Sequence, residues 1–420
     1  MTQDNRREGD KPSLNVLFIE QFGTGGLAHY VYNLCQALAE RGLGVTLLTS
    51  MDYELLDMPH AFSVLNILPL WNPWERRARN GGPLHRWAGL VSKGLRYLRG
   101  LVLSLLTIWR LRPQIIHLSE MKFLSDLVLA FFPTRARRIQ TCHNVQRFVE
   151  RRGQPNIVRA RGAWYHAQRL MYHRDHGIIF HAEENLEEFR RVFDLEPASW
   201  AVIPQGEGSL FVPARPVTKA EARRKLELDP QAPLVLFFGT IRLYKGVPTL
   251  LEALVRLRRL LPAAQLVIAG APFHDVDMVE LRAMADHLGL SEAVTWRVQY
   301  VPRDLAPLYF IACDVAALPY VKSYDSAVLK IAQALGVPAV VTDTGGLAAA
   351  VEGGQAGVVV PPEDPEALAD AMAHLLSEPE WAATLAARGL ELARTVYSWA
   401  SVAQETERFY EKVMELPCAS

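Results

Sequence analysis

Two cations, Arg242 and Lys245, follow directly after an apolar run in the middle of the chain. The run extends from Leu234 to Phe238 and ends at Gly239, which is typical of a strand buried in a parallel sheet. Open α/β sheets bind their ligands at the carboxyl ends of such strands. Arginine offers a planar fork of donors and lysine a compact charge, so the pair indicates an anionic ligand, with phosphate as the first candidate. The alternative for this segment alone is a surface turn with solvated charges.

A glycine-rich turn near the start of the chain is a second candidate anion site. Residues 15–19 form a short apolar run, Gly23, Gly25 and Gly26 follow it, and a helical pattern begins after them. Free N–H groups and the positive end of the helix dipole favour anions at such a helix N-terminus. The next apolar run, residues 45–48, completes a βαβ unit.

Three histidines lie near these features. His143 follows the predicted strand over residues 138–142, and a neutral imidazole at that edge could accept a proton from a substrate. His181 follows the predicted strand over residues 177–180. The alternative for both is a structural histidine whose hydrogen bonds are satisfied, and we expect His29 on the surface of the first helix.

Strand-like and helix-like segments alternate along the whole chain, which indicates an α/β protein. In the first half the predicted strands are residues 15–19, 45–48, 115–118, 138–142, 177–180 and 201–203. In the second half they are residues 234–238, 265–269, 293–298, 315–318, 339–342 and 357–360, with helices over 248–260, 276–288, 304–312, 327–335 and 365–376. We therefore expect two tandem Rossmann-like, doubly wound domains that face each other across a cleft.

The predicted boundary between these domains is a segment rich in glycine and proline, residues 204–216. The first domain would cover residues 1–203 and the second residues 204–396. A final helical pattern lies within residues 397–420, and we expect this helix to cross back and brace the cleft.

The composition limits the class of protein. The chain has 420 residues, of which half are hydrophobic and 21% are charged, as expected for two globular domains. Its four cysteines, residues 35, 142, 313 and 418, lack paired spacing, which indicates a reducing cytosol and neither a disulfide framework nor a zinc site. The first twelve residues lack the apolar core of a secretory signal, so we expect a cytoplasmic protein.

The zero net charge hides a strongly basic segment in the first half. Residues 76–112 include nine cations and no acid, and apolar residues such as Leu95, Leu98 and Val102 recur there at helical spacing. One hypothesis is a basic amphipathic helix on an anionic leaflet, peripheral on the inner face of the plasma membrane, with each cation adding about 1 kcal/mol. The other is an ordinary helix packed on the sheet with its cations outward. No nucleic-acid-reading module accompanies the cations, so we expect no nucleic-acid partner.

Five motifs in this order resemble the GT-B glycosyltransferases, in particular the nucleotide-sugar-dependent family 4. Gly25 and Gly26 before a helix are similar to the family's glycine loop, and Val202-Ile-Pro-Gln-Gly206 is similar to its domain junction. The segment with Arg242 and Lys245 resembles its diphosphate-binding pair. The remaining two motifs are Leu335-Gly-Val-Pro-Ala-Val-Val-Thr-Asp-Thr-Gly-Gly346 and Tyr397-Ser-Trp399.

The resemblance implies a role for each candidate residue. The first domain would bind the acceptor and the second the nucleotide-sugar donor. Arg242 and Lys245 would clamp the diphosphate and stabilise it as it leaves, with Gly25 and Gly26 also in the donor site, and His143 would touch the sugar or the acceptor hydroxyl. No Asp-x-Asp pair directly follows a predicted strand, so we expect a site without a metal ion and without any cofactor.

One departure from the family's pattern affects the donor site. The family's two glutamates, separated by seven residues, fall on Ser323 and Ile331, and an isoleucine cannot bind the ribose hydroxyls as the second glutamate does. Asp325 or Lys330 would contribute instead, or backbone groups would hold the ribose. Phosphate binding is still expected, because Ser326–Ala327 begin a helix whose N–H groups can face the anion.

The resulting hypothesis is a glycosyltransferase that moves a sugar from a UDP- or GDP-sugar to a glycan or lipid-linked acceptor, a polysaccharide precursor. The resemblance implies retention at the anomeric carbon. An NAD-dependent oxidoreductase is disfavoured, because the spacing of Gly23, Gly25 and Gly26 lacks the full dinucleotide fingerprint. Two alternatives stay open: a sugar-nucleotide epimerase of the same fold, and a non-catalytic partner protein, which the missing glutamates would favour.

Overall fold

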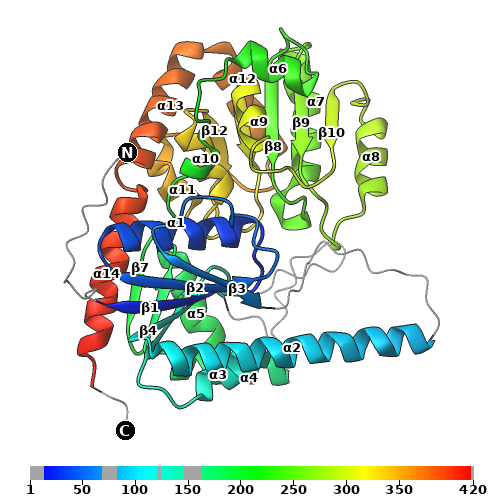
Figure 1. Cartoon of the computed structure of the whole chain (residues 1–420). Coiled ribbons are helices and arrows are strands. Elements are labelled where there is room, and N and C mark those ends of the chain that lie inside the picture. Colours follow the sequence, from blue (N-terminus) through cyan, green and yellow to red (C-terminus); the bar gives the residue numbers. More distant parts are fainter. Residues whose placement is uncertain (1–13, 69–82, 121–123, 146–161, 418–420) are drawn as a thin grey trace.

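The computed structural model describes residues 14–68, 83–120, 124–145 and 162–417 (Figure 1). They form two α/β domains, each built on a parallel sheet with helices packed on it. In Figure 1 the N-terminal domain is the lower one and the C-terminal domain is the upper one.

The N-terminal domain contains a seven-stranded sheet in the order β3-β2-β1-β4-β5-β6-β7, and all neighbouring strands are parallel. Its central strands are buried along their whole length, as the near-continuous apolar runs predict. The strands are β1 (Asn15–Ile19), β2 (Gly44–Ser50), β3 (Ser63–Leu68), β4 (Ile115–Leu118), β5 (Arg137–Cys142), β6 (Gly177–Phe180) and β7 (Trp200–Val202). The helices are α1 (Gly26–Glu40), α2 (Pro83–Leu111), α3 (Leu124–Phe131), α4 (Ala163–Arg174) and α5 (Glu183–Phe193).

The C-terminal domain contains a six-stranded parallel sheet in the order β10-β9-β8-β11-β12-β13. Its strands are β8 (Leu234–Phe238), β9 (Gln265–Ala269), β10 (Val294–Arg297), β11 (Val315–Leu318), β12 (Ala339–Thr342) and β13 (Val358–Val360). The helices are α6 (Lys219–Leu226), α7 (Val247–Leu260), α8 (Met278–His287), α9 (Ala306–Ala312), α10 (Ala327–Ala334), α11 (Leu347–Ala350), α12 (Pro365–Ser377) and α13 (Pro379–Arg394). Short 3-10 turns are η1 (Ser209–Phe211), η2 (Leu243–Lys245) and η3 (Glu352–Gly354).

Both sheets reverse their strand order near the centre, beside β1 in one domain and beside β8 in the other. Such a switch point opens a crevice at the carboxyl ends of the strands, where α/β proteins bind ligands. The expected fold class, two Rossmann-like domains in tandem, is therefore confirmed.

The last helix, α14 (Trp399–Glu415), joins the two domains. It leaves the C-terminal domain and runs down along the N-terminal one, where it packs against α1 (Figure 1). Its side chains Val402, Phe409 and Val413 are buried in the core of the N-terminal domain. Tyr410 Oη also lies 2.6 Å from Nδ1 of the buried His117 in β4. The helix thus shares a core with the first domain although it follows the second in sequence.

Helix α2 projects beyond the sheet along the lower edge of the molecule (Figure 1). No helix in the described part of the chain has the length and apolar character to cross a membrane. Most predicted strands lie within two residues of their positions in the structure, but β3 and the separate helix α13 were not predicted.

Candidate active site

A cleft of about 1600 Å³ lies between the two domains. Its walls come from segments that follow the carboxyl ends of several strands in both sheets, together with the linker and the start of α10. The predicted site residues that line it are Gly25, Gly26, Arg242, Lys245 and Ala327. His143, Asp325 and Ser326 lie outside the lining, next to residues that belong to it.

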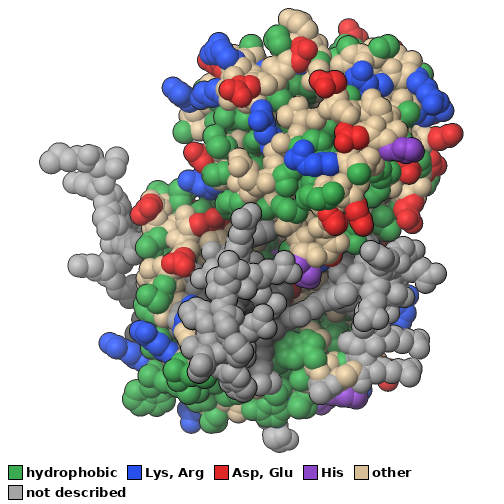
Figure 2. All heavy atoms as spheres, turned by 90° about the vertical axis from the view of Figure 1, so that its right-hand side faces the viewer, with side chains coloured by type: hydrophobic (Ala, Val, Ile, Leu, Met, Phe, Trp, Pro, Cys, Tyr) green, Lys and Arg blue, Asp and Glu red, His purple; other side chains and the backbone are tan. Residues whose placement is uncertain are grey.

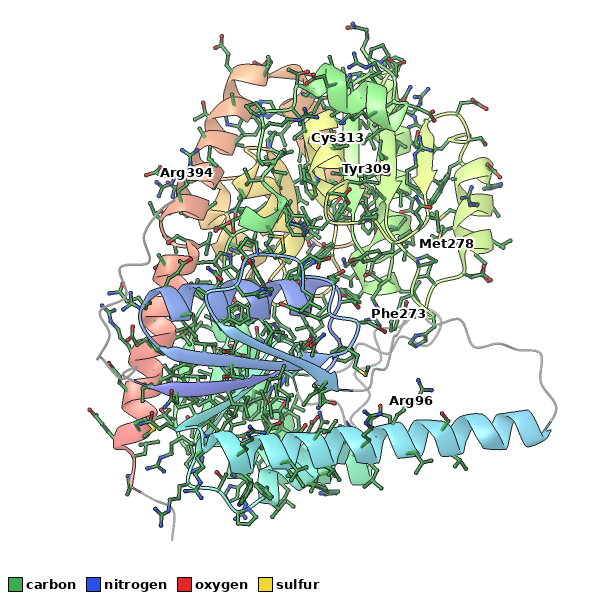
Figure 3. All side chains as sticks on the ribbon, viewed as in Figure 1. Arg96, Phe273, Met278, Tyr309, Cys313 and Arg394 are labelled. Carbon is green, nitrogen blue, oxygen red and sulfur yellow. The ribbon has the colours of Figure 1, made fainter. Side chains whose placement is uncertain are left out.

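Arg242 lies in the turn after β8 and is held on two sides. Its Nε and Nη2 atoms both lie 3.0 Å from Oδ2 of Asp275. Its guanidinium carbon lies 4.0 Å from the centre of the Phe273 ring and 5.1 Å from that of Tyr244. Phe273 is at the lower edge of the C-terminal domain, facing the N-terminal domain (Figure 3). These contacts orient the guanidinium at the cleft before any ligand arrives.

Lys245 ends the 3-10 turn η2 and is buried, yet it lines the cleft. Its Nζ atom lies 5.3 Å from the centre of the Tyr320 ring, and within the described residues it makes no hydrogen bond or ion pair. Burial and the neighbouring charge of Arg242 lower the pKa of Lys245 to about 8. An ammonium buried without a counter-charge is costly, so an anion in the cleft would be strongly stabilised there.

The start of α10 is tied to the linker by Asp325. One carboxylate oxygen accepts the N–H of Ser326 at 2.7 Å, and the other accepts the N–H of Gln205 at 3.1 Å. Ser326 in turn caps the helix, since its Oγ accepts the N–H of Leu329 at 3.3 Å. Ala327 is the first residue of α10 and lines the cleft. The geometry therefore gives Asp325 a part in joining the domains, and donor binding by Asp325 and Ser326 stays a prediction.

The two predicted histidines, His143 and His181, form a buried hydrogen-bonded pair beside the cleft. His181 Nδ1 lies 2.8 Å from the carbonyl oxygen of Ile203, so this nitrogen carries the proton. Burial lowers the pKa of His181, so its Nε2 is an acceptor for the Nδ1–H of His143 at 2.9 Å. The arrangement puts the lone pair of His143 on Nε2, the form that can accept a proton. Tyr30, which lines the cleft, packs edge to face on both rings, with ring centres 4.9 and 5.3 Å away.

Sequence reasoning missed Glu54, which connects the two walls of the cleft. Its carboxylate accepts the N–H of Gly25 at 2.6 Å, lies 2.8 Å from Nε2 of His29, and accepts the hydroxyl of Tyr300 at 2.8 Å. Burial alone would raise the pKa of Glu54, but the bonds from His29, Tyr300 and Gly25 outweigh it and lower the pKa. No local pattern could have revealed this contact, because Glu54 and Tyr300 are 246 residues apart.

Ser323 and Ile331, which stand where the family has its two glutamates, make structural contacts in this chain. Ser323 Oγ donates to the carbonyl of Asp325 at 2.9 Å, and Ile331 packs against the linker at Gly208. Lys330 is almost fully buried, with Nζ 3.9 Å from an oxygen of Asp325 and without a hydrogen-bond partner among the described residues. Burial lowers the pKa of Lys330 to about 8, with Asp325 acting in the opposite direction. Across the same described ranges, no group of three His, Cys, Asp or Glu side chains could hold a metal ion.

Two family models match the chain. The model described as "Glycosyltransferase Family 4" matches residues 24–206, and the one described as "Glycosyl transferases group 1" matches residues 218–391. The chain belongs to the group 1, family 4-like glycosyltransferases. The two models leave residues 207–217 of the linker between them. Together they contain all the residues that line the cleft except Phe22, Glu207, Gly208, Phe211 and Trp399.

Curated relatives and solved structures agree with this family. The D-inositol 3-phosphate glycosyltransferase of Corynebacterium urealyticum is 26% identical over 96% of this chain and 95% of its own length. The enzyme of that name from Segniliparus rotundus is 33% identical, over 50% of this chain and 46% of its own length. Among solved structures, sucrose-phosphate synthase of Thermosynechococcus elongatus has a TM-score of 0.70 at 22% identity, covering 95% of this chain and 98% of that one. Anabaena HepE in complex with UDP-glucose has a TM-score of 0.71 at 18% identity, covering 96% of this chain and 100% of that one.

In this glycosyltransferase the cleft therefore unites one oriented arginine, one buried lysine and a helix N-terminus on the C-terminal side. The N-terminal side contributes the glycine turn, with Glu54 bonded to it, and the hydrogen-bonded pair of histidines behind Tyr30. Such a distribution suits a ligand with an anionic group toward the C-terminal domain and a hydroxyl-bearing group toward the N-terminal domain.

Proposed function

We propose that this glycosyltransferase takes a nucleoside diphosphate sugar, with UDP or GDP as the nucleotide, and that Arg242 and Lys245 bind its diphosphate. The observation that carries the proposal is Lys245, a buried ammonium that faces a large cleft without a bonding partner in the described part of the chain. Ala327, at the N-terminus of α10, lines the same cleft and adds the positive end of a helix dipole.

The proposed reaction breaks the bond between the anomeric carbon and a diphosphate oxygen, and negative charge develops on the leaving diphosphate. Arg242 and Lys245 stabilise this charge from fixed positions, since Asp275 and Phe273 orient the arginine and burial confines the lysine. The mechanism we propose uses these groups without a metal ion. In the step we propose, the acceptor hydroxyl attacks the anomeric carbon on the face that the diphosphate leaves, so the configuration is retained, and the leaving diphosphate oxygen takes the hydroxyl proton. We propose His143 near the sugar, one layer behind Tyr30.

Relatives support a uridine nucleotide as the first donor to test. One structural neighbour carries UDP-glucose, and curated relatives are named for transfer to inositol 3-phosphate. At this level of identity the neighbour supports the fold of the site, and the contacts of Lys245 support the anion.

For the acceptor we propose a lipid-linked glycan, because α2 has an exposed apolar stripe flanked by arginines. Five successive turns of the helix present apolar side chains to solvent on one face: Val91, Leu95, Leu98, Val102, Leu106 and Trp109. Arg96 and Arg99 are exposed beside this stripe, and Arg96 extends from the projecting part of the helix (Figure 3). Figure 2, which views that projecting end, shows hydrophobic side chains gathered along the lower edge of the molecule. A basic helix with one apolar face is typical of binding to an anionic leaflet.

The donor proposal is tested by thermal unfolding and by transfer assays with UDP-, GDP-, ADP- and CMP-sugars, with and without chelator. A ligand that binds the folded protein raises the unfolding midpoint by mass action. We expect one donor to raise it, with chelator present, and to lose this effect in Lys245→Ala. If a donor stabilises Lys245→Ala as well as the wild type, the assignment of Lys245 is wrong.

The membrane proposal is tested with vesicles of phosphatidylcholine alone and with added phosphatidylglycerol. We expect co-sedimentation only with the anionic vesicles, and its loss in the double variant Leu98→Asp/Val102→Asp. Val279→Asp is the matched control, because Val279 is an even more exposed apolar residue on α8. Equal binding of the double variant and the control would contradict the proposal, and transfer to free inositol phosphate without vesicles would favour a soluble acceptor.

A second candidate function is a non-catalytic partner protein, because Ser323 and Ile331 stand where the family places glutamates. If no nucleotide sugar raises the unfolding midpoint, this alternative becomes the better one. If a donor binds and is converted to its epimer without an acceptor, the protein is a sugar-nucleotide epimerase.

A further inference from the structure

The cleft is also lined by the linker residue Glu207, which no sequence motif indicated. Glu207 lines the cleft next to the start of α10 and is half-buried. Burial raises the pKa of Glu207, and its bonds with Ser209 act in the opposite direction. The Glu207 carboxylate accepts from Ser209 and keeps further acceptor sites for a hydroxyl-bearing ligand, whereas it would repel a phosphate.

The backbone on both sides of Glu207 is packed without any spare room. A Cβ atom on Gly206 would lie 2.4 Å from the ring of Trp399, and one on Gly208 would lie 2.7 Å from Cα of Ile331. The glycines therefore allow the linker to touch both α14 and α10 through its backbone. Trp399 Nε1 also donates to the carbonyl of Glu207 at 2.9 Å, so the residue is anchored at its own backbone.

This anchoring places the linker at Glu207 and Gly208 beside the second turn of α10. Ile331, against which Gly208 packs, lies one helical turn after Ala327, or about 6 Å along the axis of α10. In a nucleoside diphosphate the ribose is joined directly to the diphosphate, so its hydroxyls lie at about this distance from the bound anion. Ile331 itself has no polar atom for them.

The other acids that line the cleft are placed differently. Asp275 forms an ion pair with Arg242 of the proposed phosphate site, while Glu120 and Asp194 belong to the N-terminal domain. Of the cleft-lining acids in the described ranges, Glu207 is the one next to α10.

We propose that Glu207 accepts hydrogen bonds from the ribose hydroxyls of the bound nucleoside diphosphate and so selects ribonucleotides over deoxyribonucleotides. This inference rests on the proposed function, because it assumes that the diphosphate lies at Arg242, Lys245 and the start of α10. It assigns to the linker a contact that α10 cannot make through Ile331.

The experiment is titration calorimetry of the full-length protein with UDP, GDP and ADP, followed by the 2′,3′-dideoxy form of whichever binds most tightly. Wild type, Glu207→Ala, the isosteric Glu207→Gln and Lys245→Ala are compared. Glu120→Ala is the matched control, since it removes a different carboxylate from the same cleft. Thermal unfolding checks that each variant is folded. If Glu207→Ala does not fold, Glu207→Gln replaces it in the comparison.

We expect the wild type and Glu120→Ala to prefer the ribonucleotide, and Glu207→Ala to bind it about tenfold or more weakly while its affinity for the dideoxy form is unchanged. If the wild type has no preference, or if the Glu207 variants keep the wild-type preference, the inference is wrong. In that case a loss of binding in Lys245→Ala would leave the proposed function intact. If the wild type binds none of the three nucleotides, the proposed function fails and the inference fails with it.

Discussion

The pH dependence of donor binding follows from the burial of Lys245. Its pKa of about 8 means that half of the free protein has lost this charge at pH 8. The bound diphosphate favours the protonated form, so the affinity is full below pH 8 and falls as the pH rises above it. At pH 9.5 only about 3% of the free protein keeps the ammonium, which predicts an affinity about 30-fold lower than at neutral pH. This factor equals about 2 kcal/mol of binding free energy.

The assay is calorimetric titration of the tightest-binding nucleoside diphosphate between pH 7 and 9.5, where the phosphate charge is constant because its second pKa is about 6. Lys245→Arg is the control, since a guanidinium stays charged across this range. Lys330 also has a pKa lowered to about 8 and faces the same cleft, so the control retains its contribution. Burial raises the pKa of Tyr320 beyond this range.

We therefore expect a steep decrease in affinity for the wild type and a shallower one for Lys245→Arg. If the affinity of the wild type does not change between pH 7 and 9.5, the reasoning is refuted, because Lys245 would then not bind the diphosphate. The same slope in both proteins would refute it as well, because another group would be titrating.

Three further predictions concern stability. His117 is neutral in the fold down to its pKa of about 3 but takes a proton in the unfolded chain below pH 6.5, so the wild type should lose about 2 kcal/mol between pH 7 and 5. Denaturant titrations should show a smaller loss in His117→Gln, and an equal loss would exclude this residue as the cause. Gly208→Ala should cost about 1–3 kcal/mol by the same assay, because its Cβ would meet the backbone of Ile331, whereas Gly94→Ala has open space and should cost nothing. Trp399→Ala should cost about 3–5 kcal/mol and Trp399→Phe less, since phenylalanine keeps a ring against the linker; equal costs would contradict the packing argument.

Local sequence patterns predicted the strands and the cations that follow them because both depend on neighbouring residues. The apolar run over residues 234–238 is β8, and the turn after it brings Arg242 and Lys245 to the cleft as expected. β3 was missed because its residues are only half-buried, so that neither a continuous nor an alternating apolar pattern is present. Residues 76–82 of the basic segment, which was predicted to contact a membrane, lie outside the described residues, whereas α2 covers the rest of it up to Leu111.

Contacts between residues that are far apart in the chain could not be predicted in this way. Donor binding by Asp325 stays a prediction, and the structure adds a contact that the sequence did not indicate, the bond from the N–H of Gln205, 120 residues earlier, to its carboxylate. His143 was expected at the cleft edge, and its ring instead lies against His181 behind the aromatic lining. Both contacts arise because a polar group next to a cleft can be satisfied by another part of the protein that is far away in the chain.

The same long-range contacts indicate how the two halves of the site are held at a working distance. On one side Glu54 of the N-terminal domain accepts the hydroxyl of Tyr300, and on the other Glu188 in α5 accepts Nζ of Lys322 at 2.7 Å together with the hydroxyl of Tyr324. The N-terminal domain supplies the carboxylates in both contacts, and the C-terminal domain supplies the donors. Because hydrogen bonds to a carboxylate are short-ranged and directional, these pairs favour the width that the cleft has in this structure. In this glycosyltransferase, local sequence at the strand ends and helix starts therefore determines which side chains reach the cleft. The distance between the two walls of the cleft is instead set by hydrogen bonds between residues that are far apart in the chain.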